Sequence, residues 1–284
     1  MIQVNRIVDW ILTEKCNLNC YYCLQNADTR NAECKSVDYS FIDNISEPIL
    51  FHLTGGEPFL VPNIIDLCIK LEQKGHYISM NTNLTIPVNT FIEKVKSEKF
   101  IFINASVHYP YRKQHMKPFI RHYMALREAG FFVYATIVMM PDEFEQISDF
   151  IKDYQSQGVI LLPKLMRGVE RGVKYPESYN DRQFSMMKNM VINSIEKMSL
   201  IDKKKFKIAC ENNVSIDNWW EFANNPIYGT RCFDGFRYIR ITEKGDIVYC
   251  NGKLLGNIKT TGFTVLQDID ICPHLKKGFC KKNI

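Results

Sequence analysis

The sequence predicts an α/β fold with a mostly parallel sheet, on three observations. Six short apolar segments alternate with amphipathic segments over the first 167 residues. Several of the amphipathic segments end at a glycine that suits a helix C-cap. The composition is that of an ordinary globular protein, with 46% hydrophobic and 24% charged residues. Strands that alternate with helices favour a parallel sheet with right-handed crossovers.

The apolar segments are the predicted strands. They are Arg6–Thr13, Pro48–Thr54, His76–Thr82, Phe100–Val107, Phe131–Met140 and Val159–Met166. The helices predicted between them are Asn63–Gly75, Thr90–Lys99, Arg112–Gly130 and Pro141–Gly158. Sheets of this kind bind ligands at the carboxyl ends of their strands, so we expect the site there.

The alternation ends at Arg167, which predicts three regions along the chain. Residues 1–167 form the α/β domain, and residues 168–228 form a linker with a helical segment. Within this second region, Gly168–Asp181 is rich in Gly, Tyr, Pro and charge, as loops are, and Gln183–Met198 has helical spacing. Residues 229–284 are rich in cysteine and form a small C-terminal domain with short strands and glycine turns.

Three cysteines follow the first predicted strand. Cys16, Cys20 and Cys23 have the spacing C-x3-C-x2-C. Three thiolates can ligate three irons of a cubane [4Fe-4S] cluster and leave the fourth iron open, since a closed cluster takes four. Ten cysteines in a chain without a recognisable signal peptide also favour metal over disulfides.

The second predicted strand is followed by Gly55, Gly56, Glu57 and Pro58. Together with the cysteine triplet, this motif resembles the radical S-adenosylmethionine (SAM) enzyme superfamily, over about the first three-fifths of the chain. The resemblance implies a partial (β/α)6 TIM-like barrel and a [4Fe-4S] cluster whose open iron chelates SAM. It also implies reductive cleavage of SAM to methionine and a 5′-deoxyadenosyl radical, which takes a hydrogen atom from the substrate.

The same resemblance implies the residues that bind SAM. The two glycines let the backbone approach the cofactor, the Glu57 carboxylate accepts a hydrogen bond from the methionyl amine, and Pro58 fixes the turn. Tyr22 lies where relatives place an aromatic residue beside the adenine. Asn83 and Ser106, at the ends of the third and fourth strands, lie where relatives hold the ribose and the methionyl carboxylate. Both side chains could equally satisfy loop backbone.

Four cysteines near the C-terminus resemble the auxiliary-cluster modules called SPASM and Twitch. They are Cys232, Cys250, Cys272 and Cys280. The resemblance implies a second, auxiliary [4Fe-4S] cluster for electron transfer, while a four-cysteine zinc site is the alternative. Cys210 is a possible substitute for Cys280, the ligand with the least typical spacing. Cys34 and Cys68 are interpreted as non-ligands, and Cys68 as a small hydrophobic residue on a helix.

Three functional interpretations follow. The first is a radical SAM enzyme that oxidises, epimerises or rearranges a small molecule or sugar-type substrate. The second is a peptide-modifying maturase, and the third is a redox or zinc-binding protein without radical catalysis. The first is favoured by the short cysteine-rich module and by the short segment before Cys16. The candidate catalytic residues are His108, Tyr109 and Glu170, although His108 has a structural interpretation as well. An electron donor such as flavodoxin or ferredoxin is the expected partner.

Charge and hydropathy exclude other classes. The net charge of +5 comes partly from lysine runs, such as Lys203–Lys207, that we interpret as solvated surface. No nucleic-acid-binding motif accompanies them. The longest apolar stretch, Phe131–Met140, is about half of the ~20 residues that cross a bilayer. With no signal-peptide pattern at the N-terminus, we expect a cytoplasmic protein that binds neither nucleic acid nor membrane.

Overall fold

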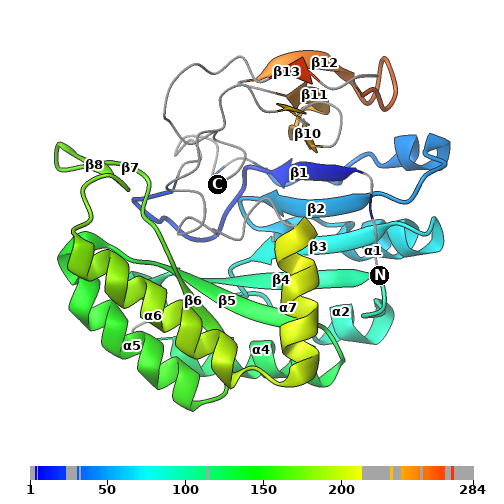
Figure 1. Ribbon diagram of the computed structural model, residues 1–284. Coiled ribbons are helices and arrows are strands. Elements are labelled where there is room, and N and C mark those ends of the chain that lie inside the picture. The colour runs from blue at the N-terminus through cyan, green and yellow to red at the C-terminus, as the bar shows by residue number, and fades with distance from the viewer. Residues whose placement is uncertain are drawn as a thin grey trace.

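The main feature of the computed structural model is one large, mostly parallel sheet (Figure 1). The structure describes residues 4, 6–23, 31, 33–112, 115–212, 231–232, 238–249, 252–265 and 270–271. Within these residues the sheet has nine strands in the order β12-β11-β10-β1-β2-β3-β4-β5-β6. The pairs from β1 to β6 are all parallel. This confirms the predicted α/β class with a mostly parallel sheet.

The six predicted strands are present, each within a few residues of its expected bounds. They are β1 (Ile7–Thr13), β2 (Leu50–Gly55), β3 (Tyr77–Thr82), β4 (Phe100–Val107), β5 (Val133–Val138) and β6 (Leu161–Lys164). The helices are α1 (Ile64–Gln73), α2 (Asn89–Lys94), α3 (Tyr109–Arg112), α4 (Met116–Glu128), α5 (Phe144–Ser156), α6 (Asp181–Lys197) and α7 (Leu200–Asn212), with short 3-10 turns η1 (Ser40–Asn44), η2 (Pro58–Leu60) and η3 (Pro141–Glu143). Helix α2 ends before its predicted end because Val95 has an extended backbone and is buried.

The two faces of the sheet pack against different helices. On each strand, alternate side chains point to opposite faces. One set packs with buried side chains of α1, α2, α4 and α5 in the larger hydrophobic cluster. The other set, which includes Leu50, Phe102 and Tyr134, packs with Phe206 and Ala209 of α7 in a second cluster. We call this second side the inner face. In Figure 1, α7 crosses in front of it.

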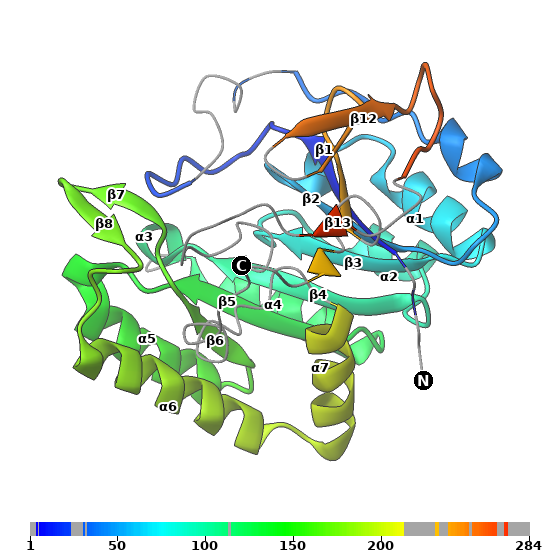
Figure 2. The ribbon, with the colours of Figure 1, turned by 45° about the horizontal axis from the view of Figure 1, so that its top comes forward.

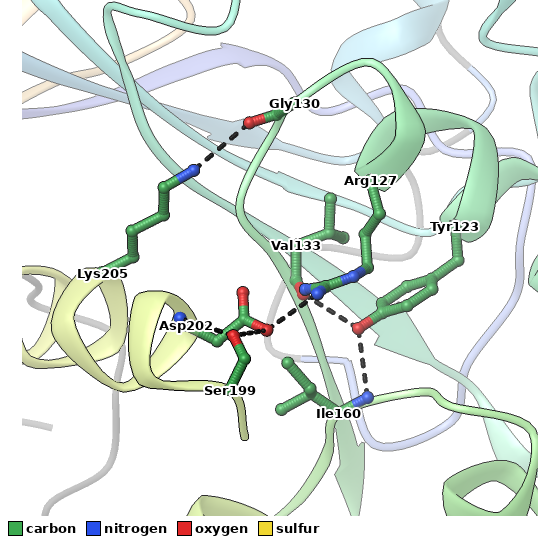
Figure 3. Close-up of polar contacts among 8 residues, drawn as sticks. All are labelled: Tyr123, Arg127, Gly130, Val133, Ile160, Ser199, Asp202 and Lys205. Atoms are coloured by element: carbon green, nitrogen blue, oxygen red, sulfur yellow. Dashed lines mark hydrogen bonds and ion pairs between the residues drawn. The ribbon is translucent and has the colours of Figure 1, made fainter.

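Polar contacts hold α7 to the end of α4 and to the turn that follows it (Figure 3). Arg127 Nη2 donates to Asp202 Oδ2 at 2.8 Å, and Ser199 Oγ donates to the same oxygen at 2.9 Å. Lys205 Nζ donates to the carbonyl oxygen of Gly130 at 3.3 Å. The lysine run therefore lies on α7, where its charged groups stay partly or fully exposed while Phe206 turns toward the sheet.

Strands from the C-terminal region join the same sheet. β10 (Tyr238–Ile241) pairs in parallel with β1, and β11 (Asp246–Tyr249) and β12 (Lys253–Asn257) continue outward as an antiparallel pair. Arg240 donates to Asp9 Oδ2 across the β10–β1 junction, at 2.9 Å from Nε. The separate pair β9 (Arg231–Cys232) and β13 (Asp270–Ile271) is antiparallel. Figure 1 shows β10, β11, β12 and β13 above β1.

The segment after β6 forms a hairpin rather than an irregular loop. β7 (Gly168–Glu170) and β8 (Val173–Tyr175) pair antiparallel around a turn at Arg171 and Gly172, both with positive φ. The hairpin projects from the side of the molecule where β6 ends (Figure 2). Among the helices of the described residues, none has the length and apolarity needed to cross a membrane.

The Arg127–Asp202 ion pair gives a prediction about stability. Because the pair is partly buried and shared with Ser199, Arg127→Met should lower the free energy of unfolding by about 1–3 kcal/mol, the worth of a charged hydrogen bond. The exposed pair Lys152–Asp149 supplies the control, and Lys152→Met should cost much less than Arg127→Met. Chemical denaturation measures both, and equal effects would contradict the role given to Arg127.

Candidate active site

Two loops meet at the carboxyl ends of β1 and β2. We call residues 14–23 the cysteine loop and residues 55–58 the Gly-Gly-Glu-Pro loop. Their backbones are hydrogen-bonded directly, with Gly56 N donating to Thr13 O at 2.7 Å and Glu57 N to Lys15 O at 2.9 Å. The sequence motif therefore becomes one compact structure that spans two strand ends.

The glycines are required by this contact between the loops. A Cβ atom on Gly56 would lie 2.0 Å from Lys15 O, and one on Gly55 would lie 2.3 Å from Thr13 O. Gly55 also has φ of +140°, a conformation that suits glycine. The glycines were expected to allow close approach of a cofactor, and in the structure their close neighbour is the backbone of residues 13–15.

The Glu57 side chain is fully buried, with 0% of its surface exposed, and is held by three donors. Thr82 Oγ1 donates to Oε1 at 2.7 Å and Phe59 N to the same atom at 3.1 Å, while Asn83 N donates to Oε2 at 2.6 Å. Burial raises the pKa of Glu57 to about 7, against the lowering effect of these hydrogen bonds. A carboxylate has about four acceptor positions, so one remains for a cationic or N–H ligand.

The three cysteines lie on the exposed side of this contact. Cys16 Sγ accepts from Leu18 N at 3.4 Å, and Cys20 Sγ lies 3.1 Å from His108 Nδ1. All three thiols are partly exposed. In the described part of the chain, no three His, Cys, Asp or Glu side chains are already gathered as metal ligands are.

Tyr22 and His108 interact beside Cys20. Tyr22 Oη lies 2.9 Å from His108 Nδ1, and the two rings stack with centroids 6.0 Å apart. Burial lowers the pKa of His108 to about 4, so its imidazole is neutral near pH 7. Burial also raises the pKa of Tyr22, so its phenol keeps its proton. The sequence indicated a possible role for each residue separately, and the structure shows that they are in contact.

Asn83 links the two loops. Its Nδ2 donates to Asn17 Oδ1 at 2.9 Å and lies 3.9 Å from Cys16 Sγ, while its Oδ1 accepts from Thr85 N at 3.0 Å. Its backbone N–H bonds to Glu57. The side chain thus supports loop structure, which is the alternative that the sequence left open for it.

The other predicted site residues have varied positions. Ser106 is half-buried in β4, across from Thr136. Tyr109 is buried and packs edge-on against Phe150 with ring centroids 5.1 Å apart. Cys68 is fully buried in α1, as expected, and Cys34 Sγ lies 3.5 Å from Thr13 Oγ1. Pro58 is buried at the start of η2, as expected for a residue that fixes a turn.

Several predicted residues fall outside what the structure describes. The backbones of Glu170, Cys210 and Cys232 lie in β7, α7 and β9, but their side chains are outside the described set. Cys250, Cys272 and Cys280 lie outside the described residues altogether. Their proposed roles therefore stay predictions.

A row of polar side chains that runs across the inner face from one strand to the next was not predicted from the sequence. Asn104 Oδ1 accepts from Thr136 Oγ1 at 3.0 Å, and Asn104 Nδ2 donates to Asn81 Oδ1 at 3.0 Å. Asn81 Nδ2 lies 2.9 Å from His52 Nε2, and His52 Nδ1 lies 2.8 Å from Ser79 Oγ. Burial lowers the pKa of His52, so the whole row is uncharged near pH 7. We call these five residues the inner polar row.

A signal for this row was present in the sequence. Its members are polar residues at alternate positions of strands that are otherwise apolar, as in Tyr77-Ile-Ser79-Met-Asn81. In a strand, alternate residues share one face. Such a pattern indicates a polar surface on one side of a buried sheet.

The comparison with protein families agrees with this geometry. Residues 10–154, about half of the chain, match the radical SAM superfamily. The chain therefore belongs to the radical SAM superfamily. The matched region begins in β1 and ends in α5, so it contains the cysteine loop, the Gly-Gly-Glu-Pro loop and the whole inner polar row.

Two relatives each match about a third of the chain. An AdoMet-dependent heme synthase from Methanosarcina barkeri is 31% identical over 104 residues, which cover 34% of this chain and 29% of that enzyme. A probable GTP 3′,8-cyclase from Pyrobaculum aerophilum is 24% identical over 104 residues, which cover 35% of this chain and 33% of that protein. The shared segment thus spans a third or less of each relative.

Solved structures share the fold over most of the chain. The structure of anSMEcpe with bound AdoMet and Kp18Cys peptide gives a TM-score of 0.61 at 16% identity, covering 91% of this chain and 79% of that one. Streptococcus suis SuiB bound to S-adenosylmethionine gives 0.57 at 15% identity, covering 92% of this chain and 62% of that one. These similarities support the partial barrel.

The residues present fit the cluster and SAM that the superfamily implies. Three thiols occupy one loop, and the contact between this loop and Glu57 is made by backbone atoms that a side chain would exclude. Glu57 retains one acceptor position. The site therefore provides thiolates for iron and a buried carboxylate for an amino group, one beside the other.

The contact at Gly56 gives a second prediction. Gly56→Ala should separate the two loops, because its Cβ cannot lie 2.0 Å from Lys15 O. We expect a loss of stability of more than about 2 kcal/mol and a loss of iron at the cysteine loop. Gly75→Ala is the control, since a Cβ there meets nothing within 4 Å; it should cost about 1–2 kcal/mol for its positive φ and leave iron content unchanged. Iron assay and denaturation test both, and full iron in Gly56→Ala would contradict the prediction.

The Glu57 carboxyl gives a third prediction. Its pKa is about 7 in the folded protein and 4.5 ordinarily, so between these values the folded state binds more protons than the unfolded state. Stability conferred at low pH is then lost as the pH rises from about 4.5 through 7. Relative to Glu57→Gln, the metal-free wild type should lose up to about 3 kcal/mol over this range and change little above it. Denaturation at several pH values measures this difference, and a constant difference would refute the assignment.

Proposed function

We propose that this protein is a radical SAM enzyme that cleaves SAM reductively and takes a hydrogen atom from a polar substrate at the inner face of the sheet. One observation carries the proposal beyond family membership. The cysteine loop and the buried Glu57 are joined by backbone hydrogen bonds at the carboxyl ends of β1 and β2. This is the edge of a parallel sheet where ligands bind.

The cofactors supply the difficult chemistry. When bound, the cluster and SAM supply one-electron cleavage to methionine and a 5′-deoxyadenosyl radical that abstracts hydrogen. Cys16, Cys20 and Cys23 hold the cluster by three irons, and Glu57 accepts a hydrogen bond from the methionyl amino group. Tyr22 is the residue proposed beside the adenine, and Asn83 and Ser106 are proposed at the ribose and the methionyl carboxylate.

The inner polar row supports a polar substrate. Buried amide, hydroxyl and imidazole groups cost stability unless they are satisfied, and here they satisfy one another next to the site. Charged groups flank them, since Asp9, Arg240 and Lys164 are all near enough to influence the pKa of His52. Among the candidate bases, His108 lies at the cysteine loop, whereas Tyr109 packs into the core. Glu170, in the β7–β8 hairpin, stays a candidate.

Two substrate classes fit this surface. A small molecule or sugar-type substrate suits a row of fixed amide and hydroxyl groups, and we place it first. A peptide is the second class, because anSMEcpe and SuiB were solved with bound peptides and share the fold of this chain. Oxidation, epimerisation or rearrangement are the reactions proposed for either class.

An auxiliary [4Fe-4S] cluster is part of the proposal. The pairing of β9 with β13 brings the backbone of Cys232 across from Asp270, two residues before Cys272 along the chain. Cys250 follows directly after β11. Four thiolates there would close the coordination of a second cluster for electron transfer, with zinc as the alternative metal. A small electron carrier such as flavodoxin or ferredoxin is the proposed donor.

Anaerobic reconstitution tests the proposal directly. The wild type should bind about eight irons, and the Cys16/Cys20/Cys23→Ala triple variant about four, because each cubane holds four. With SAM and dithionite, the wild type should produce 5′-deoxyadenosine and methionine, and the triple variant should produce neither.

The outcomes separate the parts of the proposal. Wild-type protein that binds iron but yields no 5′-deoxyadenosine would overturn the radical SAM activity. About four irons with one zinc would overturn only the auxiliary cluster. Cys68→Ala, a change of a buried thiol outside the site, is the control and should keep both iron content and product formation.

A further inference from the structure

Arg112 is a buried cation next to the proposed SAM site, and neither the motif nor the proposed chemistry uses it. It is the last residue of α3, directly after β4, and only 1% of its surface is exposed. Burying a guanidinium is costly unless its charge and donors are used. Its surroundings therefore indicate what it does.

The guanidinium holds backbone carbonyls. Arg112 Nη2 donates to the carbonyl oxygen of Asn83 in a short hydrogen bond, and Nη1 donates to that of His115 at 3.3 Å. Its plane lies over the Phe119 ring, 4.6 Å from the centroid. Within the described residues its Nε has no hydrogen-bond partner. The strongest directed contact of Arg112 is thus with Asn83.

The backbone at Asn83 and Leu84 requires such support. Leu84 has φ of +50°, a left-handed conformation that costs a non-glycine residue about 1–2 kcal/mol. His122 Nδ1 lies 3.1 Å from the Leu84 carbonyl oxygen. Side chains from α3 and α4 therefore hold two successive carbonyls of a strained turn, and Arg112 provides the charged contact.

Asn83 is the residue through which this support reaches the site. Its N–H donates to Glu57 Oε2, and its side chain contacts Asn17 and Cys16 of the cysteine loop. The Glu57 carboxylate and the Arg112 guanidinium thus bond to opposite sides of one residue. Their charges also interact, since Arg112 opposes the rise in the pKa of Glu57 that burial causes.

We propose that Arg112 is a positioning residue for SAM. It holds Asn83 in place, and Asn83 in turn fixes the Glu57 carboxylate and the cysteine loop, the two proposed partners of the amino-acid end of SAM. This inference rests on the proposed function of the same site. A core arginine that only stabilises the fold would change stability without a specific change in SAM affinity.

The test measures SAM affinity in reconstituted protein by anaerobic equilibrium dialysis with labelled SAM. Arg112→Met should weaken SAM binding about 10- to 100-fold, the equivalent of one charged hydrogen bond. Arg112→Lys keeps the charge but cannot reach two carbonyls, so it should weaken binding by less. Arg127→Met is the matched control, since it removes a partly buried arginine that holds α7; it should leave SAM affinity within about 2-fold.

A double variant tests whether Arg112 acts through Glu57. If it does, adding Arg112→Met to Glu57→Gln should weaken SAM binding by much less than Arg112→Met does in the wild type. Independent effects would multiply and would overturn the proposed route. Hydrogen exchange of the amides of residues 82–85 should also be faster in Arg112→Met than in Arg127→Met.

Failure of this inference is distinguishable from failure of the proposed function. If the wild type with full iron does not bind SAM, the function is wrong. If the wild type binds SAM and Arg112→Met binds it equally well, only the role of Arg112 is wrong. Should Arg112→Met not fold, Arg112→Lys decides, and wild-type affinity in that variant would overturn the inference.

Discussion

The arrangement of the site depends on one backbone contact, between the end of β1 and the end of β2. Gly56 N and Glu57 N donate to carbonyls on either side of Glu14, and the absence of a side chain on Gly56 permits this distance. Both loops continue from paired parallel strands, so the sheet fixes their spacing before any metal arrives. A thiol-bearing loop and a buried carboxylate are thereby held together by groups that carry no charge and do not titrate.

Much of the sheet could be predicted from sequence because parallel strands buried on both faces read as nearly continuous apolar runs. The ends of β1 and β2, and so the positions of both motifs, followed from those runs. The pairing of β10 with β1 could not be read, because more than two hundred residues separate them and strand pairing leaves no local pattern. The buried side of α7 was missed for another reason, since the surrounding lysines hide Phe206 and Ala209.

The motif residues of the site could be predicted from the sequence, whereas the residues that support them could not. Cysteine spacing and a glycine pair have chemical meanings that survive without a structure. Arg112 does not, because an arginine in sequence gives no sign of burial, and its partner is a backbone carbonyl rather than a side chain. The inner polar row was partly predictable. Its polar residues alternate visibly along the sequence of each strand, but the contacts between strands depend on the strand order, which the sequence does not show. What sequence omits here is mainly hydrogen bonding between elements that are distant along the chain.

These supporting contacts explain how an incomplete metal site can be kept in shape. Hydrogen bonds within the protein supply part of the geometry of the cysteine loop, the proposed cluster site. Asn83 provides part of it, by joining Glu57, the cysteine loop and Arg112 through separate atoms of one residue. Burying the charge of Glu57 or of Arg112 alone would cost stability, and the opposite charges reduce that cost when both are buried. Because Asn83 connects both buried groups to the cysteine loop, this polar connection stabilises the loop at which we propose that the cluster binds.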